Sequence, residues 1–268
     1  MEKLKAKKSL GQNFLKDDQV LEKIVKNGNI SPDDVVIEIG PGQGALTELL
    51  VEKCKKVIAI ELDDRLIPVL QEKFQYDENV EIIHDDILKI NLPELIVKNE
   101  LQSGYKVIAN IPYYITAPII RLLLETKFPP SEIILMVQKE VAERITAKPG
   151  SMSILAVSVQ YYSEARYLFT VPRAAFDPVP KVDSAIIKIV TSNQQSVTSE
   201  KKEEVKKFFR IVRAGFSAKR KTLENNLSNG LHVDKKEVLE KIESIGFVKN
   251  TRAQELSVED WKKLVNIL

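Results

Sequence analysis

The sequence has little of what stabilises a secreted protein or anchors one in a membrane. Cys54 is the single cysteine among 268 residues, which excludes an internal disulfide and is typical of a reducing compartment. Uninterrupted apolar runs are short, such as IILMV over 133–137, whereas a membrane-spanning helix needs about 18 or more apolar residues. No apolar signal-peptide core follows the basic start, MEKLKAKKSLGQNFL. We therefore expect a cytoplasmic protein that has no membrane segment.

The net charge of +2 is small, but the basic residues are unevenly distributed. Residues 201–222 carry nine Lys and Arg side chains against only Glu203 and Glu204. Four lysines lie within the first eight residues, against Glu2 alone. Two such clusters favour a polyanionic partner. Charge alone leaves a solvated, lysine-rich surface equally open.

Apolar runs alternate with helical patterns through the first two-thirds of the chain. Five runs predict strands: VVIEI (35–39), VIAIE (57–61), VEIIH (80–84), KVIAN (106–110) and EIILMV (132–137). Such continuous runs suit a parallel sheet that is covered on both faces. The intervening segments, such as ALTELLVEK and DRLIPVLQEKF, have helical spacing. The alternation predicts an open, doubly wound α/β sheet, which is a Rossmann-like fold.

The last third of the chain predicts a different organisation. SMSILAVSVQYY (151–162) predicts a helix, whereas YLFTV (167–171) and SAIIKIV (184–190) predict two strands with no helix between them. Their connection, PRAAFDPVPKVD, is rich in proline and irregular. We therefore expect these two strands to form an antiparallel addition at the edge of the sheet.

A polar stretch after the last strand marks a domain boundary. TSNQQSVTSE (191–200) has no periodicity and is predicted to be a linker, and four helical patterns follow it. We predict one domain over residues 1–192 and a small helical domain over residues 200–268. The first domain begins with a basic arm, residues 1–16. Basic arms often fold only on binding, so we expect weak order there when the partner is absent.

Three glycines follow the first predicted strand. Gly40, Gly42 and Gly44 are spaced G-x-G-x-G in EIGPGQGALTELL, directly before a predicted helix. Glycines at this position let the backbone approach a ligand closely at the carboxyl end of a strand. A dinucleotide site typically has the spacing G-x-G-x-x-G and places a pyrophosphate on the helix N-terminus. The observed spacing therefore fits a dinucleotide poorly.

Acidic residues end the next two predicted strands. Glu61 lies 21 residues after Gly40, where a carboxylate can accept hydrogen bonds from both hydroxyls of a ribose. HDDI places Asp85 or Asp86 beside an adenine ring, with a helix-capping role as the alternative for each. A glycine loop with two strand-end acids suits an adenosine-bearing cofactor that lacks a pyrophosphate. S-adenosylmethionine is the natural candidate, and we expect no metal.

The fourth predicted strand ends in ANIPYYI, at the same edge of the sheet as the cofactor residues. The exocyclic amine of adenine is a poor nucleophile because its lone pair is delocalised into the ring. The Asn110 side-chain oxygen and the Ile111 carbonyl can accept the amine hydrogens and turn the lone pair toward a methyl donor. Pro112 sets the turn, and Tyr113 offers a ring on which a flipped-out base can stack. A strand-terminating turn with a packed tyrosine is the alternative.

Several stretches of the chain carry a resemblance to a known family. They are LGQNFL (10–15), EIGPGQGALT (38–47), IELD (60–63), HDDIL (84–88), NIPYY (110–114), LMVQKEVAERI (135–145), FDPVPKVDSAII (176–187) and FSAKRKTLENNL (216–227). Over essentially its whole length the chain resembles the ribosomal RNA adenine N6,N6-dimethyltransferases, and among them the bacterial small-subunit enzymes. The resemblance implies a Rossmann-like S-adenosylmethionine-dependent methyltransferase sheet, mostly parallel with an antiparallel edge strand, and a small C-terminal helical domain that binds RNA.

The resemblance also implies roles for individual residues. Those expected to contact the cofactor are Asn13, Leu15, Gly40, Glu61, Asp86 and Asn110. This set selects Asp86 over Asp85. Phe176 is expected to be a second aromatic residue near the target base, with simple packing beneath a proline-rich loop as the alternative. Tyr114 is expected to pack, with a contact to RNA as the lesser alternative. The basic residues expected to bind RNA are Lys7, Lys8, Arg213, Lys219, Arg220 and Lys221.

The implied reaction dimethylates two adjacent adenines near the 3′ end of small-subunit rRNA in a pre-ribosomal particle, and we expect a monomer. Asn-Ile-Pro-Tyr stands where the family often has Asn-Leu-Pro-Tyr. The Ile form also occurs in the large-subunit rRNA resistance methyltransferases, which are the nearest alternative. PKVDSA and AKRKTLENNL favour the small-subunit enzymes. A ribosome-assembly or RNA-binding factor with the same fold is a second alternative, against which the intact cofactor loop argues.

Overall fold

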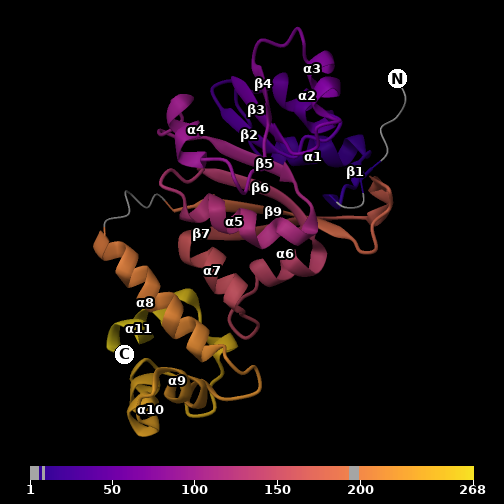
Figure 1. Ribbon diagram of the computed structural model, residues 1–268. Helices are drawn as coiled ribbons and strands as arrows, with labels where there is room; N and C mark the ends of the chain where they lie inside the picture. The colour runs from indigo at the N-terminus through magenta and orange to yellow at the C-terminus, as the bar shows by residue number, and fades with distance from the viewer. Residues whose placement is uncertain (1–5, 8–9, 193–198) are drawn as a thin grey trace. The chain divides into compact units, whose positions relative to one another are not determined.

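The computed structural model describes residues 6–7, 10–192 and 199–268 (Figure 1). By its contacts the chain divides into two compact units, the first being Met1–Ala142 with Glu164–Asn193 and the second Glu143–Ser163 with Gln194–Leu268. Three predictions fall at least partly outside the described residues. They concern the RNA contact of Lys8, the order of residues 1–5 in the arm, and most of the linker.

A seven-stranded sheet forms the centre of the first unit (Figure 1). Its strands are β2 (Val35–Ile39), β3 (Lys56–Glu61), β4 (Val80–His84), β5 (Lys106–Asn110), β6 (Glu132–Gln138), β7 (Ser163–Val171) and β9 (Ser184–Thr191). Their order in space is β4-β3-β2-β5-β6-β9-β7. The pairs β2–β3, β2–β5, β3–β4 and β5–β6 are parallel, whereas β9 pairs antiparallel with β6. The predicted α/β fold, mostly parallel with an antiparallel addition, is confirmed.

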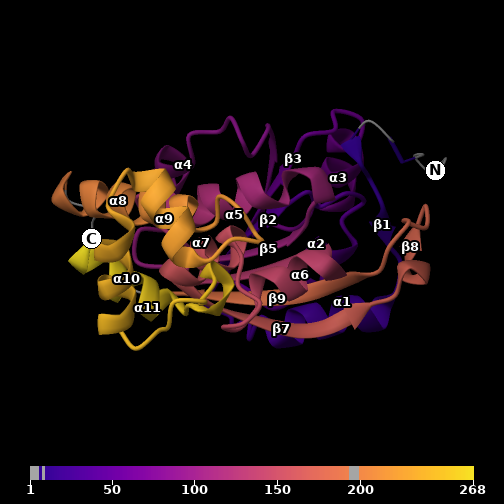
Figure 2. The same cartoon turned by 90° about the horizontal axis from the view of Figure 1, so that it is seen from below.

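Helices cover both faces of this sheet (Figure 2). They are α1 (Asp18–Asn27), α2 (Ala45–Val51), α3 (Ile67–Lys73), α4 (Leu92–Lys98) and α5 (Thr116–Glu125), and α6 (Lys139–Ile145) follows β6. On one face, Ile24 of α1 and Leu50 of α2 join Val57 and Ile108 of the strands in one apolar cluster. α4 and α5 lie over the opposite face (Figures 1 and 2). Coverage of both faces explains why the central strands are apolar at nearly every position.

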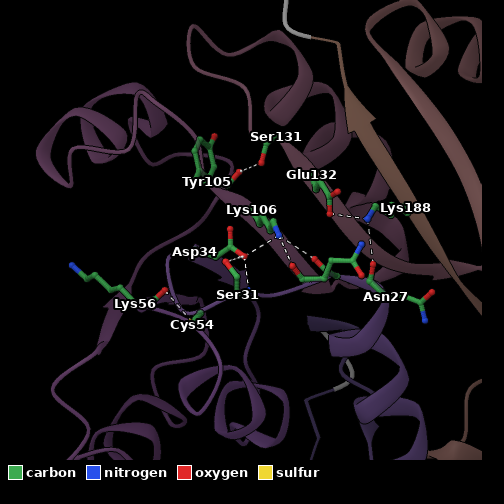
Figure 3. A network of polar contacts seen from close by, with 12 residues as sticks. Asn27, Ser31, Asp34, Cys54, Lys56, Tyr105, Lys106, Ser131, Glu132 and Lys188 are labelled. Carbon is green, nitrogen blue, oxygen red and sulfur yellow. Dashed lines mark hydrogen bonds and ion pairs between the residues drawn. The ribbon is translucent and has the colours of Figure 1, made fainter.

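Ion pairs tie the strands together near their amino ends (Figure 3). Lys106, which begins β5, lies 2.9 Å from Asp34 and donates to the Asn29 carbonyl at 2.8 Å. Lys188 of β9 lies 2.8 Å from Glu132, which begins β6, although this contact lacks the alignment of a hydrogen bond. All four charged side chains are at most 22% exposed. Partly buried charges need a partner to offset lost hydration, so these pairs fix the sheet at the edge away from the polar motifs.

A separate two-stranded ribbon joins the N-terminal segment to a late loop. β1 (Phe14–Leu15) pairs antiparallel with β8 (Phe176–Asp177), so that Leu15 lies opposite Phe176. The Lys16 amide donates to the Ala175 carbonyl at 2.9 Å and extends the pairing by one residue. The Lys16 ammonium lies 2.7 Å from the Asp177 carboxylate. Neither strand is predicted from the sequence, because two residues are too few to show a period.

The second unit is a set of helices packed around Trp261. They are α7 (Ile154–Tyr162), α8 (Ser199–Gly215), α9 (Leu223–Leu231), α10 (Lys235–Ser244) and α11 (Val258–Ile267). Trp261 is fully buried and shares one apolar cluster with Phe208, Leu227 and Met152. The four helical patterns predicted after residue 200 are thus present as α8 to α11.

The division into units differs from the predicted domains at one place. Residues 143–163, which the predicted domain 1–192 includes, belong to the second unit by their contacts. Ala156 and Val157 of α7 are fully buried in the same apolar cluster as residues of α8 and α11. An apolar helix face must be buried against some partner, but helical periodicity does not say which partner.

Candidate active site

A cavity of about 540 Å³ lies within the first unit, at the carboxyl ends of the parallel strands. Ten of the predicted site residues line it: Asn13, Leu15, Gly40, Gly42, Glu61, Asp86, Asn110, Ile111, Pro112 and Tyr113. They meet because parallel strands all end at one edge of the sheet, so residues far apart in the chain come together there. Cavities of roughly 300–1,000 Å³ hold small-molecule ligands and cofactors.

The glycine loop between β2 and α2 approaches the cavity with its backbone. Gly40, Gly42 and Gly44 have φ values of +71°, +59° and +77°, a region that favours glycine. A Cβ added at Gly40 would meet only the Asn110 carbonyl oxygen, at 3.7 Å, and would take up space at the cavity wall. A Cβ added at Gly44 would lie 2.7 Å from the Phe74 ring. Gly44 does not line the cavity, so its requirement for glycine comes from packing.

Glu61, at the end of β3, is a buried carboxylate that fastens this loop. Its Oε2 accepts a hydrogen bond from the Gly42 amide at 3.1 Å. Its Oε1 accepts from the amides of Leu62 and Asp63, at 2.9 Å each. Burial raises the pKa of Glu61, and the three hydrogen bonds oppose the rise. Because a carboxylate has about four acceptor positions, Oε2 keeps one for a ligand hydroxyl.

Glu38, in β2, is a second buried carboxylate that lines the cavity. It is 2% exposed and accepts a hydrogen bond from the Thr47 hydroxyl at 2.7 Å. Burial raises the pKa of Glu38 to about 7; the Thr47 hydrogen bond opposes this rise, and the nearby charge of Glu61 adds to it. Glu38 is not among the predicted site residues. The acid inside the apolar run VVIEI is a sequence pattern that could have identified this site residue, since burying a charged group costs free energy.

Asp85 and Asp86 follow β4, and both line the cavity. Asp86 Oδ1 accepts from the Leu88 amide at 3.0 Å, and Asp85 Oδ1 accepts from the Asp86 amide at 2.7 Å. Both acids therefore stabilise the turn after β4. Neither caps a helix, because the next helix, α4, begins at Leu92 with Asn91 as its N-cap. Each carboxylate keeps further acceptor positions, so this role does not prevent a contact with a ligand. The selection of Asp86 over Asp85 stays a prediction.

The N-terminal segment 10–16 contributes to the lining of the cavity. Gln12 Nε2 donates to the carboxylate of Asp63 at 2.8 Å, and the Arg65 guanidinium donates to the same carboxylate at 2.9 and 2.6 Å. The Arg65 guanidinium holds the pKa of Asp63 far below its usual range, so this anchor stays charged at neutral pH. Asn13 and Leu15 reach the cavity from this segment. Their contact with a cofactor stays a prediction.

The motif after β5 presents two oxygen atoms. Asn110 ends β5 and lies opposite Met136 of β6. Among the residues that the structure describes, neither the Asn110 side-chain amide nor the Ile111 carbonyl has a hydrogen-bond partner. Pro112, with φ −57° and ψ 136°, turns the chain into a short 3₁₀ helix, Tyr113–Ile115. Both oxygens therefore remain available to a ligand in the cavity.

The two tyrosines of the motif have different surroundings. Tyr113 is partly buried, and its hydroxyl shares a hydrogen bond of 2.8 Å with the Ser184 hydroxyl. Burial raises the pKa of Tyr113, with Ser184 opposing the rise, so the phenol is neutral at pH 7. Tyr114 is 61% exposed and also lines the cavity. It is therefore a rim residue of the cavity, exposed where packing is the main expectation, and a contact of its ring with RNA stays a prediction.

Phe176 does not reach the cavity in the structure. It is 3% exposed and lies in the apolar cluster between the sheet and α1 and α2. Successive residues of a strand point to opposite sides, so Phe176 of β8 points inward while Asp177 lines the cavity. Pro178, which follows the strand, also lines the cavity. The packing alternative describes this position. Stacking of a base on Phe176 would require the β1–β8 ribbon to open, and it stays a prediction.

The predicted RNA-binding residues fall in both units. Lys7, in the first unit, is exposed. The four in the second unit are also exposed: Arg213, Lys219, Arg220 and Lys221. Over the described ranges, none of these four has an ion pair with an acidic side chain, so their charges are available to a partner. Asn226 donates to the carbonyls of Gly215 and Ala218, at 2.6 and 3.1 Å, and so stabilises the loop that carries Lys219.

Two other kinds of site are absent from the described part of the chain. Within residues 6–7, 10–192 and 199–268, no three His, Cys, Asp or Glu side chains are grouped so that they could hold a metal ion. In the same residues, no helix combines the length and the apolar character that crossing a membrane requires.

Comparison of the sequence with known proteins finds one family and many relatives. The profile of the ribosomal RNA adenine dimethylases matches residues 3–268. A ribosomal RNA small subunit methyltransferase A from Dehalococcoides mccartyi strain CBDB1 is 48% identical over 261 residues, covering 97% of this chain and 88% of that protein. The protein of the same name from Geobacillus thermodenitrificans strain NG80-2 is 46% identical over 268 residues, covering 98% and 90%.

Solved structures give the same picture. A dimethyladenosine transferase from Plasmodium falciparum superimposes with a TM-score of 0.78 at 30% identity, over 94% of this chain and 95% of that chain. The 23S rRNA methyltransferase ErmE superimposes with a TM-score of 0.77 at 26% identity, over 96% and 99%. Both matches span nearly the whole chain, so they include the helices after residue 200 as well as the sheet.

Proposed function

Because the chain belongs to the ribosomal RNA adenine dimethylase family, we propose that it dimethylates the N6 amines of two adjacent adenines near the 3′ end of small-subunit (16S) rRNA, with S-adenosylmethionine as methyl donor. Membership of the family makes the chain an rRNA adenine dimethyltransferase. The subunit, the pair of adenines and the donor are the proposed part. The choice of subunit is supported by relatives at 46–48% identity that are named small-subunit methyltransferases.

The observation that carries the chemistry is the pair of free acceptors at the end of β5. The Asn110 side-chain oxygen and the Ile111 carbonyl have no partner among the described residues, and both residues line the cavity. An adenine amine has two hydrogens, and two fixed acceptors can hold both. The amine then leaves the plane in which its lone pair is delocalised, and the lone pair becomes directed and nucleophilic. Preorganised dipoles of this kind activate the amine without first removing a proton. Each nitrogen that gains a methyl group would then release one proton to solvent.

The cavity fits an adenosine-bearing cofactor. Gly40 leaves space that a Cβ would fill, and Glu61 keeps an acceptor position for a hydroxyl. Glu38 and Glu61 bring acidic groups to the cavity, which suits a ligand with positive charge. When bound, S-adenosylmethionine supplies a methyl group activated by a sulfonium. The residues proposed to hold it are Asn13, Leu15, Gly40, Gly42, Glu61, Asp86 and Asn110.

Tyr113 is proposed to provide the stacking surface for the flipped-out adenine. Its ring lines the cavity next to the two acceptors, and its hydroxyl is engaged by Ser184. A neutral phenol that is already hydrogen-bonded is not a base for the amine. Its contribution is the ring, and stacking of a base on an aromatic ring is worth about 1–3 kcal/mol.

The RNA itself is proposed to contact the exposed basic residues of both units, with Lys7 in the first and Lys219, Arg220 and Lys221 in the second. Phosphate contacts of this kind supply affinity that depends on salt but carries little sequence information. We further propose that the substrate is small-subunit rRNA within a pre-ribosomal particle, that the enzyme is a monomer, and that it acts in the cytoplasm, where this RNA is assembled.

Transfer of tritiated methyl groups from S-adenosylmethionine to unmethylated small ribosomal subunits tests the proposal. We expect incorporation into N6,N6-dimethyladenine of the small-subunit rRNA and none with a precursor of the large subunit. The second substrate is needed because ErmE, a 23S rRNA methyltransferase, shares the fold at 26% identity. Incorporation into large-subunit RNA alone would show that the substrate is large-subunit rRNA. Tight binding of small subunits without incorporation would favour a ribosome-assembly factor instead.

A further inference from the structure

Ser184 is a buried hydroxyl that lies beside the motif of the proposed reaction. It is 0% exposed, and its hydroxyl shares a 2.8 Å hydrogen bond with the hydroxyl of Tyr113. Among the described residues, this is the one hydrogen bond of the Ser184 side chain. The two residues are 71 positions apart in the sequence. Tyr113 lines the cavity and Ser184 does not, so Ser184 can act on a ligand only through the tyrosine.

The direction of β9 brings Ser184 to this place. β9 begins at Ser184 and runs antiparallel to β6, with Ser184 opposite Gln138, the last residue of β6. The first residue of an antiparallel strand lies at the edge where its parallel neighbours end. A ninth strand running parallel to β6 would place its first residue at the opposite edge, far from the cavity. The antiparallel direction of β9 thus places Ser184 at the edge of the sheet where the cavity lies.

The residue before Ser184, Asp183, is held by two hydrogen bonds. The carbonyl of Asp183 accepts a hydrogen bond from the Lys139 amide at 3.0 Å, and the Asp183 carboxylate accepts from the Arg173 amide at 2.9 Å. Ser184 therefore offers its hydroxyl from a rigid position. Tyr113, by contrast, belongs to a short 3₁₀ helix after a proline, and two side-chain torsions set the orientation of its partly buried ring.

We propose that Ser184 is a positioning residue, which holds the Tyr113 ring at the orientation required for stacking of the target adenine. This role rests on the proposed function, since it assumes that a base enters the cavity beside Asn110. Positioning of a group to within about half an ångström is a large part of catalysis when little acid–base chemistry takes place. The Tyr113 hydroxyl has no other task in this arrangement. Removing either hydroxyl should therefore have the same effect.

A double-mutant cycle tests the inference, with Ser184→Ala, Tyr113→Phe and the variant carrying both. Loss of one hydrogen bond predicts a fall of about three- to tenfold in kcat for methyl transfer, with the KM for S-adenosylmethionine unchanged. The double variant should lose no more than either single variant, because both remove the same bond. Ser163→Ala is the matched control, since Ser163 is also buried but donates to the Val159 backbone carbonyl. We expect it to leave kcat unchanged.

Several outcomes would overturn the inference. Multiplicative losses in the double variant would show that the hydroxyls act separately. Full activity of Ser184→Ala would show that the ring needs no support, and an equal fall in kcat for Ser163→Ala would reduce the effect to general destabilisation. If Ser184→Ala folds poorly, Tyr113→Phe removes the same hydrogen bond at the residue that is only partly buried. Full activity of Tyr113→Phe would equally refute the role of Ser184. Failure of the wild-type chain to methylate small-subunit RNA would refute the proposed function, whereas these results with an active wild type refute only the role of Ser184.

Discussion

Replacing Glu38 by glutamine should remove a pH-dependent cost of folding. Glu38 is 2% exposed, and its pKa is raised from the ordinary value of 4.5 to about 7, mainly by burial. Between these two pH values the folded protein holds a proton that the unfolded chain has released. Raising the pH through this window therefore favours the unfolded state, and the loss of stability is complete above about pH 7.

The magnitude follows from the same two values. Their difference is about 2.5 pH units, and each unit corresponds to about 1.4 kcal/mol, so ionised Glu38 lowers the free energy of unfolding by about 3 kcal/mol. Glutamine has nearly the same shape and cannot ionise. Its amide oxygen can still accept the hydrogen bond from Thr47, which measures 2.7 Å in the present structure. We therefore expect similar stabilities for the variant and the wild type near pH 5, and an advantage of about 3 kcal/mol for Glu38→Gln at pH 8.

The assay must report on the first unit. Trp261, the single tryptophan, lies in the second unit, so its fluorescence follows that unit. Amide hydrogen exchange of peptides from β2 and β3, measured in urea at pH 5, 6, 7 and 8 with correction for intrinsic exchange, follows the sheet. Glu72→Gln, the same change at an exposed position of α3, is the control. A difference between Glu38→Gln and wild type that does not vary with pH, or a variant less stable at pH 8, would refute the reasoning.

Three further results are expected. Asn110→Ala should lower the rate of methyl transfer by about 10²–10³-fold, as removal of one preorganised polar contact does. RNA affinity, measured by filter binding, should stay nearly unchanged. A matching loss of RNA binding would contradict the role given to Asn110. Replacing Lys219, Arg220 and Lys221 by alanine should weaken RNA binding. The slope of the logarithm of the binding constant against the logarithm of salt concentration should become shallower by about 2, at roughly 0.7–0.9 per phosphate contact. An unaltered slope would show that this loop does not contact the RNA. Gly40→Ala and Gly44→Ala carry a similar backbone cost of roughly 1–2 kcal/mol, but only Gly44→Ala adds a clash with Phe74. Urea unfolding should therefore show the larger loss of stability for Gly44→Ala. Calorimetry should show the larger loss of cofactor affinity for Gly40→Ala.

Local patterns in the sequence are sufficient to predict much of the fold and many of the residues that line the candidate site. Apolar runs predict all seven strands of the central sheet at least in part, although only residues 167–171 of β7 are predicted. The inner strands are apolar at nearly every position because both faces of the sheet are covered there. Gly40, Glu61 and Asn110 are recognisable because they directly follow or end these runs. Parallel strands end at one edge, so knowing the strands is enough to bring their last residues together.

The contacts that complete the site depend on strand order and direction, which no local period encodes. Ser184 meets Tyr113 because β9 reverses direction beside β6. Phe176 is buried because a two-residue ribbon with β1 turns it inward. The pKa of Glu38 is raised because folding surrounds it with apolar groups and places Glu61 nearby. Sequence periodicity reports which face of an element is buried, whereas the identity of the partner is settled by packing across distant parts of the chain.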